Sequence, residues 1–210
     1  MQTIAVVDYG ASNLRSVSKA LEHVCGKDYR IMVSETAEHL LAADRVVFPG
    51  QGAIGQCMDC LHDKSLVEVV KECISSKPFL GICLGLQSLM NHSEEDGGTT
   101  CLDVIDGNVR RFRPGPGEKH MKIPHMGWNR VVQEKPHSLW KGIESGERFY
   151  FVHSYYVDAT QASDVAGSCD YLVKFNAALA RDNFFATQFH PEKSQRAGLQ
   201  LLQNFLHWNP

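Results

Sequence analysis

The chain has 210 residues, 43% of them hydrophobic and 21% charged, a composition typical of a globular protein, which excludes a disordered or low-complexity chain. Its formal net charge of −3 excludes the basic surface expected of a protein that binds nucleic acid or a membrane surface. The seven cysteines form an odd, widely spaced set, which argues against a secreted disulfide scaffold and favours the cytoplasm. The sequence shows neither a targeting segment nor an apolar run long enough to span a membrane, so we expect a soluble protein.

The first half of the chain alternates apolar strands with segments of helical period. One helix is predicted after Asn13, which stands at its N-cap, and another is predicted after Ser65. The predicted strands around them are Thr3–Asp8, Tyr29–Val33, Arg45–Phe48 and Pro78–Ile82. Strands and helices that alternate in this way are typical of βαβ units, so we predict a parallel sheet with helices on both faces.

The second half is rich in strands without long helices between them, and these strands are expected to extend the same sheet in antiparallel fashion. They are predicted at Asn108–Phe112, Trp128–Gln133, Arg148–Val157, Val165–Cys169, Leu172–Ala177 and Phe184–Phe189. A final helix, at about Ser194–His207, has Leu199, Leu202 and Phe205 on one face. The Pro/Gly-rich run 113–117 is too short for a domain boundary, so we predict one α/β domain over residues 1–210 with a central mixed, largely parallel sheet.

The sequence Gly-Ile-Cys-Leu-Gly at 81–85 lies between a predicted strand and a helix predicted at Leu84–Asn91. It has the spacing of a nucleophile elbow, in which a strained strand-to-helix turn exposes the central side chain and two glycines allow strand and helix to approach. Cys83 would then lie at a helix N-terminus that favours its thiolate, with the backbone N–H of Leu84 free to receive an oxyanion. The alternative is a buried structural cysteine between two packing glycines.

A thiolate nucleophile needs a base, and the sequence His190-Pro191-Glu192 supplies one at the end of the last predicted strand. Residues two apart on an extended segment point the same way, so Glu192 is placed to orient one nitrogen of His190 while the other faces the cysteine. A surface turn with an ordinary histidine is the alternative, since the chain contains ten histidines.

The glycines at 50, 52 and 55 satisfy the G-x-G-x-x-G pattern of dinucleotide-binding proteins. The next predicted strand ends without the carboxylate that such a site needs for the ribose, so we favour a glycine loop whose N–H groups complete an oxyanion hole beside Cys83. A zinc site is not expected either, because Cys57 and Cys60 form a C-x-x-C without a second ligand pair, and the His190-x-Glu192 pattern lacks a downstream P-C-x-x-C.

Taken together, the sequence 81–87 and His190-Pro191-Glu192 resemble the class I (triad) glutamine amidotransferases over most of the chain. The resemblance implies a flavodoxin-like amidotransferase fold, a glutaminase activity on L-glutamine, and no metal or cofactor. Further segments resemble those members of the family that serve a cyclase subunit in histidine biosynthesis. These segments are Asp8–Gly10 with Asn13-Leu14, Pro124–Asn129, Phe151–Tyr155, and Lys193-Ser194 after the triad motif.

The resemblance also implies roles for individual residues, grouped as follows. The catalytic triad would be Cys83, His190 and Glu192; the oxyanion hole Gly52 and Leu84; the glutamine-binding residues Gln87, Glu95, Ser154 and Tyr155; and the partner-facing residues Asn13, Trp128 and Lys193. Gln87 and Glu95 would hold the α-carboxylate and α-amino ends of glutamine. The sequence departs from the family at Gln51, where many relatives have a small apolar residue, and at Ser12, where glycine is usual.

A partner is expected because the chain carries no second site that would use ammonia. The implied partner is a cyclase subunit in a heterodimer. Two alternatives remain open. In the first alternative, the chain is the glutaminase of another ammonia-using synthase, in pyridoxal phosphate, purine, aminobenzoate or specialised sugar synthesis. Alternatively, it is a non-catalytic binding or redox protein that uses the elbow cysteine.

Overall fold

The computed structural model describes residues 1–10, 14–115, 117 and 121–210, and within them thirteen strands form one mixed sheet. Its parallel part has the order β2 (Tyr29–Ser34), β1 (Gln2–Val7), β3 (Arg45–Gly50), β4 (Phe79–Cys83) and β13 (Phe184–Thr187). This is the order of a doubly wound flavodoxin-like sheet, as the family resemblance implies, and the parallel pairing is the one that the alternating sequence pattern predicts. Ligands bind to such sheets beyond the carboxyl ends of the strands, so we expect a ligand site at the ends of β3, β4 and β13.

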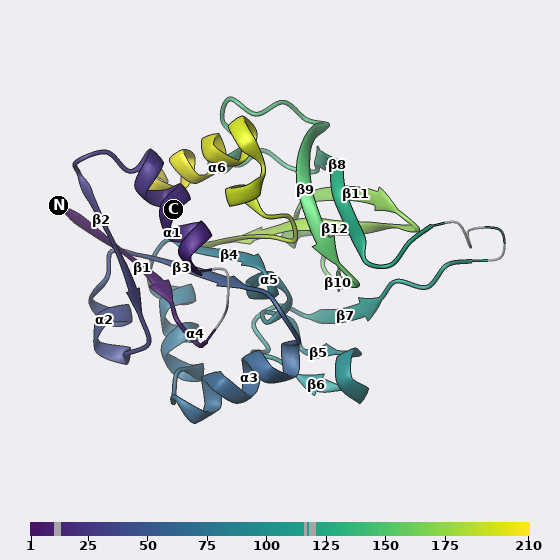
Figure 1. The fold of residues 1–210 in the computed structure, drawn as a ribbon, viewed down its shortest axis with the longest axis horizontal. Helices are drawn as coiled ribbons and strands as arrows, with labels where there is room; N and C mark the ends of the chain where they lie inside the picture. The colour runs from purple at the N-terminus through teal and green to yellow at the C-terminus, as the bar shows by residue number, and fades with distance from the viewer. Residues whose placement is uncertain (11–13, 116, 118–120) are drawn as a thin grey trace.

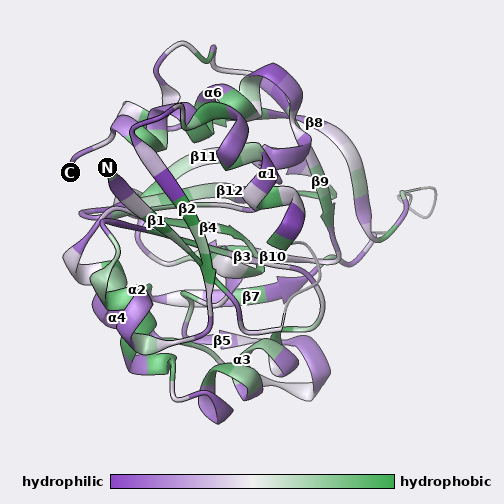
Figure 2. Ribbon diagram, turned by 60° about the vertical axis from the view of Figure 1, so that its left-hand side comes forward, coloured by the Kyte–Doolittle hydropathy of each residue, from purple (hydrophilic) through white to green (hydrophobic). Residues whose placement is uncertain are grey.

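Helices cover both faces of this parallel part (Figure 1). The helices are α1 (Leu14–Val24), α2 (Ala37–Ala42), α3 (Ile54–Asp63), α4 (Val67–Ser76), α5 (Leu84–Gln87) and α6 (Gln195–His207). Successive residues of β1 enter two separate cores: Ile4 packs in a cluster with residues of α1 and α6, whereas Ala5 packs in another with residues of α2, α3 and α4. The central strands are therefore hydrophobic on both sides (Figure 2), which explains their largely apolar sequences; the exception is the buried Arg45 at the start of β3, which donates to the carbonyl of Phe205.

The second half of the chain extends the sheet with antiparallel strands, as predicted. β12 (Val173–Arg181) pairs antiparallel with β13, and the path continues through the antiparallel strands β10 (Tyr155–Ala159) and β7 (Gly107–Arg111). It ends in two short strands of the first half that were not predicted: β5 (His92–Ser93), which is parallel to β7, and β6 (Thr99–Thr100). A branch from β12 runs through β11 (Val165–Tyr171), β8 (His125–Gln133) and β9 (Glu147–His153). Short 3-10 helices occur at Glu95–Gly97 (η1), Ser138–Trp140 (η2), Ala162–Asp164 (η3) and Pro191–Lys193 (η4).

The elbow helix is much shorter than predicted, because α5 ends at Gln87 instead of Asn91. The carbonyl groups that a longer helix would use internally are taken by a later segment. Leu102 donates its backbone N–H to the carbonyl of Ser88 over 2.8 Å, and Cys101 donates to that of Asn91 over 3.0 Å. These bonds come from residues that follow the helix by more than a turn, so the local pattern does not reveal them.

Two other local predictions were wrong. The strand predicted at Arg148–Val157 is interrupted at Ser154, which separates β9 from β10. Ser65 does not cap the following helix, because it has φ 54° and Leu66 occupies the N-cap position. On α6, Leu202 and Phe205 are buried, and Leu199 of the same predicted face is half-buried. The predicted N-cap Asn13 lies outside the described residues.

No helix in the described parts of the chain combines the length and apolarity needed to cross a bilayer.

Candidate active site

Cys83 occupies a sharp turn between β4 and α5. It is the last residue of β4 and has φ 54° and ψ −99°, a backbone conformation that L-residues other than glycine adopt only when the surrounding structure holds them there. The flanking glycines are required by close contact: a Cβ on Gly81 would lie 2.8 Å from the carbonyl oxygen of Gly85, and a Cβ on Gly85 would lie 1.9 Å from that of Phe48. The turn therefore has the geometry that the elbow spacing predicts.

His190 and Glu192 lie behind Cys83 as a buried pair. Their side chains are both 0% exposed, and His190 Nδ1 lies 2.8 Å from Glu192 Oε1. Burial alone would favour the neutral ring and lower the pKa of His190, but its interactions with the adjacent Cys83 and then with Glu192 raise that pKa to about 10. The geometry therefore favours an imidazolium whose Nδ1–H donates to Glu192. Its other nitrogen, Nε2, has no hydrogen-bond partner among the described residues.

Gln188 contacts the nucleophile, although the sequence reasoning did not select it. Its Nε2 donates to Cys83 Sγ over 3.6 Å, and its Oε1 accepts from Gln87 Nε2 over 3.3 Å. A signal was present in the sequence. Gln188 is a polar residue at the end of an apolar strand, two positions before His190, and therefore on the same side of an extended segment.

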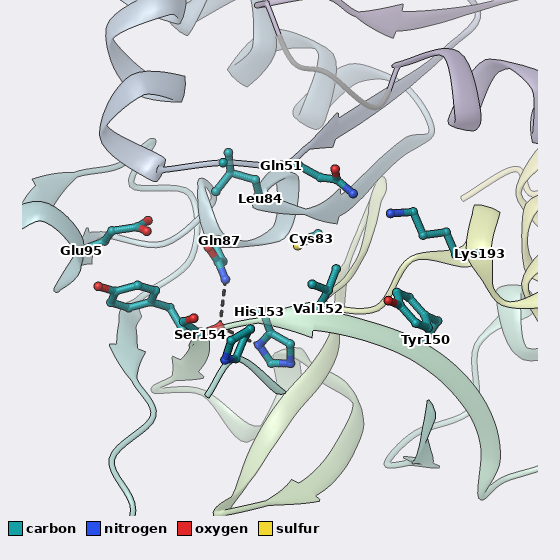
Figure 3. Close-up of a pocket in the computed structure, with 13 residues that line it drawn as sticks. Gln51, Cys83, Leu84, Gln87, Glu95, Tyr150, Val152, His153, Ser154 and Lys193 are labelled. Atoms are coloured by element: carbon teal, nitrogen blue, oxygen red, sulfur yellow. Dashed lines mark hydrogen bonds between the residues drawn. The ribbon is translucent and has the colours of Figure 1, made fainter. Parts of the chain in front are cut away.

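A cavity of about 410 Å³ opens beside Cys83, between the end of β3, the elbow, η1 and the β9–β10 junction (Figure 3). This volume is in the range of small-molecule sites. The predicted site residues that line it are Gly52, Cys83, Leu84, Gln87, Glu95, Ser154, Tyr155 and Lys193. Other lining residues, outside the predicted site, are Gln51, Pro124, Tyr150, Val152 and His153.

Two of the residues that line the cavity, Gln87 and Glu95, carry oxygen acceptors. Gln87 uses its Nε2 to donate to Tyr155 O over 3.0 Å and to Gln188 Oε1, so Oε1 is the atom of this amide left for a ligand. The Glu95 carboxylate accepts from the backbone N–H of Ile54 over 2.9 Å, and burial raises its pKa. A carboxylate and an amide oxygen together suit a ligand ammonium group.

The glycine loop after β3 is fixed at one end and open at the other. A Cβ on Gly50 would lie 2.1 Å from the Tyr9 hydroxyl and 2.7 Å from Leu84 Cβ, so this residue is wedged beside the elbow. Gly52 has φ +111°, and a Cβ there would meet no atom within 4 Å. The loop therefore enters the cavity from a rigid anchor and has space to turn at Gly52.

The mouth of the cavity carries an aromatic and cationic cluster. The Tyr150 ring lies 6.2 Å from the Trp128 ring, and Lys193 Nζ lies 5.9 Å from the Tyr150 centroid. Trp128 does not line the cavity; it is exposed on β8 together with Met126 and Val132, at alternate positions. We call these three residues the β8 patch. The third predicted partner-facing residue, Asn13, is outside the described part of the chain, as is Ser12.

Behind the cavity, two buried histidines form a hydrogen-bonded pair. His153 Nδ1 lies 2.7 Å from the carbonyl oxygen of Tyr155, and its Nε2 lies 2.9 Å from His125 Nδ1. Since the carbonyl accepts, His153 donates from Nδ1 and its Nε2 accepts from His125. Burial lowers the pKa of His125 to about 4 and that of His153 to about 3, so both rings are neutral near pH 7.

This histidine pair predicts that the fold loses stability in mild acid. In the unfolded chain both rings titrate near 6.5, so below that pH the unfolded state binds more protons than the folded state. The free energy of unfolding should therefore fall as the pH drops from 6.5 toward 4, by roughly 1.4 kcal/mol per pH unit for each ring. His190 has the opposite sign, because its raised pKa contributes stability that is lost only as the pH rises toward 10. Urea unfolding at about pH 7 and about pH 5 measures the effect, and equal free energies would contradict it.

Comparison with known proteins places this geometry in a family. The family model described as glutamine amidotransferase class-I matches residues 5–208. The chain is 54% identical over 209 residues to the imidazole glycerol phosphate synthase subunit HisH of Nitrosococcus oceani, covering 100% of this chain and 99% of the relative. It is 55% identical over 216 residues to the subunit of the same name from Dechloromonas aromatica, covering 100% and 98%.

The same fold occurs in more distant solved structures. The crystal structure of a putative GMP synthase component from Thermoplasma acidophilum superimposes with a TM-score of 0.72 over 99% of this chain and 93% of that chain, at 22% identity. A second structure, described only as a glutamine amidotransferase, gives a TM-score of 0.70 at 16% identity, over 97% of each chain. At these identities the likeness concerns the fold alone.

Proposed function

The chain belongs to the class I glutamine amidotransferase family, and from this premise we propose that it is the glutaminase subunit of an imidazole glycerol phosphate synthase. The observation that carries the proposal is the juxtaposition of Cys83, on a strained elbow, with the buried pair of His190 and Glu192 beside one cavity. The full-length relatives at 48–55% identity bear the name of that subunit, which favours it over another ammonia-using synthase. Co-purification with a cyclase or with another synthase distinguishes these two.

The residues at the elbow account for hydrolysis of a side-chain amide. The Cys83 thiolate attacks the amide carbon of glutamine, and the resulting oxyanion is received by the backbone N–H groups of Leu84 and Gly52. The His190 imidazolium, oriented by Glu192, protonates the departing ammonia and leaves a γ-glutamyl thioester. Neutral His190 then takes a proton from water, and the hydroxide attacks the thioester; glutamate is released, and the Cys83 thiolate and the His190 imidazolium are regenerated.

The orientation of the substrate follows from the free acceptors of the cavity. Gln87 Oε1 and the Glu95 carboxylate suit the α-ammonium group of glutamine, whereas the family resemblance assigns Gln87 to the α-carboxylate. The α-carboxylate is then left to Ser154 and Tyr155, which line the cavity at the β9–β10 junction. The interruption of the predicted strand at Ser154 thus has a use, because it presents these two residues to the substrate.

The proposed partner is the cyclase subunit, in a heterodimer, which uses the ammonia to form imidazole glycerol phosphate and AICAR in histidine biosynthesis. The exposed β8 patch and Lys193 at the cavity mouth supply an apolar and cationic surface for it. The cysteines, seven in all and free of disulfides, agree with a cytoplasmic enzyme.

We expect partner binding to raise the glutaminase activity through the glycine loop. Because Gly52 is unhindered while Gly50 is wedged, the loop can turn its N–H toward or away from the oxyanion, and one such donor is worth about 10²–10³ in rate. Glutamine hydrolysis by the purified chain should therefore rise about 10²-fold or more when the cyclase and its ribonucleotide substrate are added. Full turnover by the isolated chain, unchanged on adding both, would contradict the loop switch. No hydrolysis in the assembled enzyme would contradict the proposed function itself.

A further inference from the structure

A buried chain of side-chain amides joins the substrate cavity to the nucleophile. Gln87 lines the cavity and donates to Gln188, and Gln188 donates to the sulfur of Cys83. Gln188 is 0% exposed and does not line the cavity, so it is placed to act on the sulfur and not on a ligand. We propose that Gln188 is a positioning residue for the nucleophile, which holds Cys83 Sγ by an amide N–H and is itself oriented by Gln87. This inference rests on the proposed glutaminase activity.

A backbone carbonyl sets the direction of the hydrogen bonds along this chain. The Tyr155 oxygen can only accept, and it lies 3.0 Å from Gln87 Nε2 and 2.7 Å from His153 Nδ1. Gln87 must therefore turn its amide nitrogen toward this oxygen, and the second hydrogen of that nitrogen reaches Gln188 Oε1. With its oxygen engaged in this way, Gln188 has only its N–H groups to offer to Cys83. The Tyr155 carbonyl, which can only accept a hydrogen bond, thus determines that Gln188 donates to the sulfur of Cys83.

The position of this donor matters because the thiolate is buried. Cys83 is 7% exposed, so water is a poor substitute for a protein donor, and a hydrogen bond to an ionised group is among the stronger kinds. The backbone of Cys83 is already held at φ 54°, which leaves the side-chain torsion as the freedom that Gln188 removes. A correctly placed sulfur affects the chemical step, whereas glutamine binding relies on other residues. The expected signature is a lower kcat with little change in KM.

The test measures glutamine hydrolysis by the enzyme assembled with its cyclase. Gln188→Leu should lower kcat by about 10- to 100-fold and change KM by less than about 3-fold, because a charge-assisted hydrogen bond is lost while the cavity walls remain. Gln133→Leu is the matched control: Gln133 Nε2 donates to the Ile143 carbonyl over 2.8 Å, away from the cavity, and its loss should leave kcat unchanged.

A second variant isolates the donor from the shape of the side chain. Gln188→Glu keeps the size and the acceptor for Gln87, but the new carboxyl group donates to the sulfur only when it is protonated. Its activity relative to wild type should therefore rise as the pH is lowered from about 8 to about 6. A purely structural role for Gln188 predicts a ratio that is constant with pH. This variant also carries the test if Gln188→Leu does not fold.

The outcomes separate the two proposals. If the wild-type assembled enzyme hydrolyses no glutamine, the proposed function is wrong and the role of Gln188 falls with it. If the wild type is active and Gln188→Leu matches it, or loses activity only through a higher KM, the role of Gln188 alone is wrong. A ratio for Gln188→Glu that does not change with pH would likewise overturn it.

Discussion

Cys83→Ala should abolish glutamine-dependent turnover, with a loss of about 10⁴-fold or more, while the assembled enzyme continues to use ammonia supplied in the buffer. The reason is that Cys83 is the nucleophile of the proposed thioester route, whereas the cyclase reaction needs only the ammonia that the route releases. Because the alanine lacks the sulfur and keeps the backbone, the elbow should remain folded. Activity is measured with glutamine and with an ammonium salt as alternative nitrogen donors.

Another cysteine of the same chain provides the control. Cys25 is half-buried beyond the end of α1, where it packs against the core, and it does not line the cavity, so Cys25→Ala should retain both activities. If Cys83→Ala hydrolysed glutamine as well as wild type does, the cavity would not work through a covalent intermediate. The non-catalytic binding or redox role, left open by the sequence, would then be favoured.

The parallel part of the fold could be predicted from the sequence because its strands are buried on both faces. A strand such as β4, buried at every position, has no polar or charged residue, and that pattern is local and easy to recognise. The pattern predicted a parallel sheet, whereas the flavodoxin-like order was implied by the family resemblance. The antiparallel extension was predicted in outline from strand-like segments without long helices between them, although its branching at β12 was not.

The errors concern places where distant residues decide the local structure. The elbow helix ends early because residues 101–105 bind the carbonyls of residues 88–91, and no local signal announces a partner that lies so much later in the chain. The strand is interrupted at Ser154 because the chain changes its partner there: β9 pairs with β8 up to His153, and β10 pairs with β7 from Tyr155 onward. In both cases tertiary hydrogen bonds overrode local propensity.

Some residues of the candidate site could likewise be predicted from the sequence, and others could not. Cys83, His190 and Glu192 could be selected because the chemistry demands particular residue types at short spacings. Gln188 could not be selected by that argument, because an amide is neither nucleophile nor base, and its contact with Cys83 spans 105 positions in the sequence. The orientation of the Gln87 amide was likewise beyond the sequence, since the Tyr155 carbonyl that decides it lies on another strand.

Gly85→Ala and Gly198→Ala should each destabilise the fold by about 3 kcal/mol or more, a large part of the total stability of a typical domain. A Cβ at either position would lie 1.9 Å from a backbone oxygen, that of Phe48 for Gly85 and that of Pro191 for Gly198. Backbone atoms in a packed core have little room to move, so the strand or helix itself must shift. Since Pro191 lies between His190 and Glu192, any Gly198→Ala protein that folds should also lose glutaminase activity.

A third glycine, Gly55, provides a matched control for this prediction. Gly55 lies in α3, and a Cβ there would meet no atom closer than 3.5 Å, so Gly55→Ala gains helix propensity without a clash. It should stabilise the chain by about 0.5–1 kcal/mol, although the substitution is chemically identical. Urea unfolding of the three variants, with glutamine turnover measured on each, compares them directly. If Gly85→Ala or Gly198→Ala were as stable as Gly55→Ala, the close approach of α5 to β3, or of α6 to η4, would not be the constraint that holds the nucleophile and the triad histidine in place.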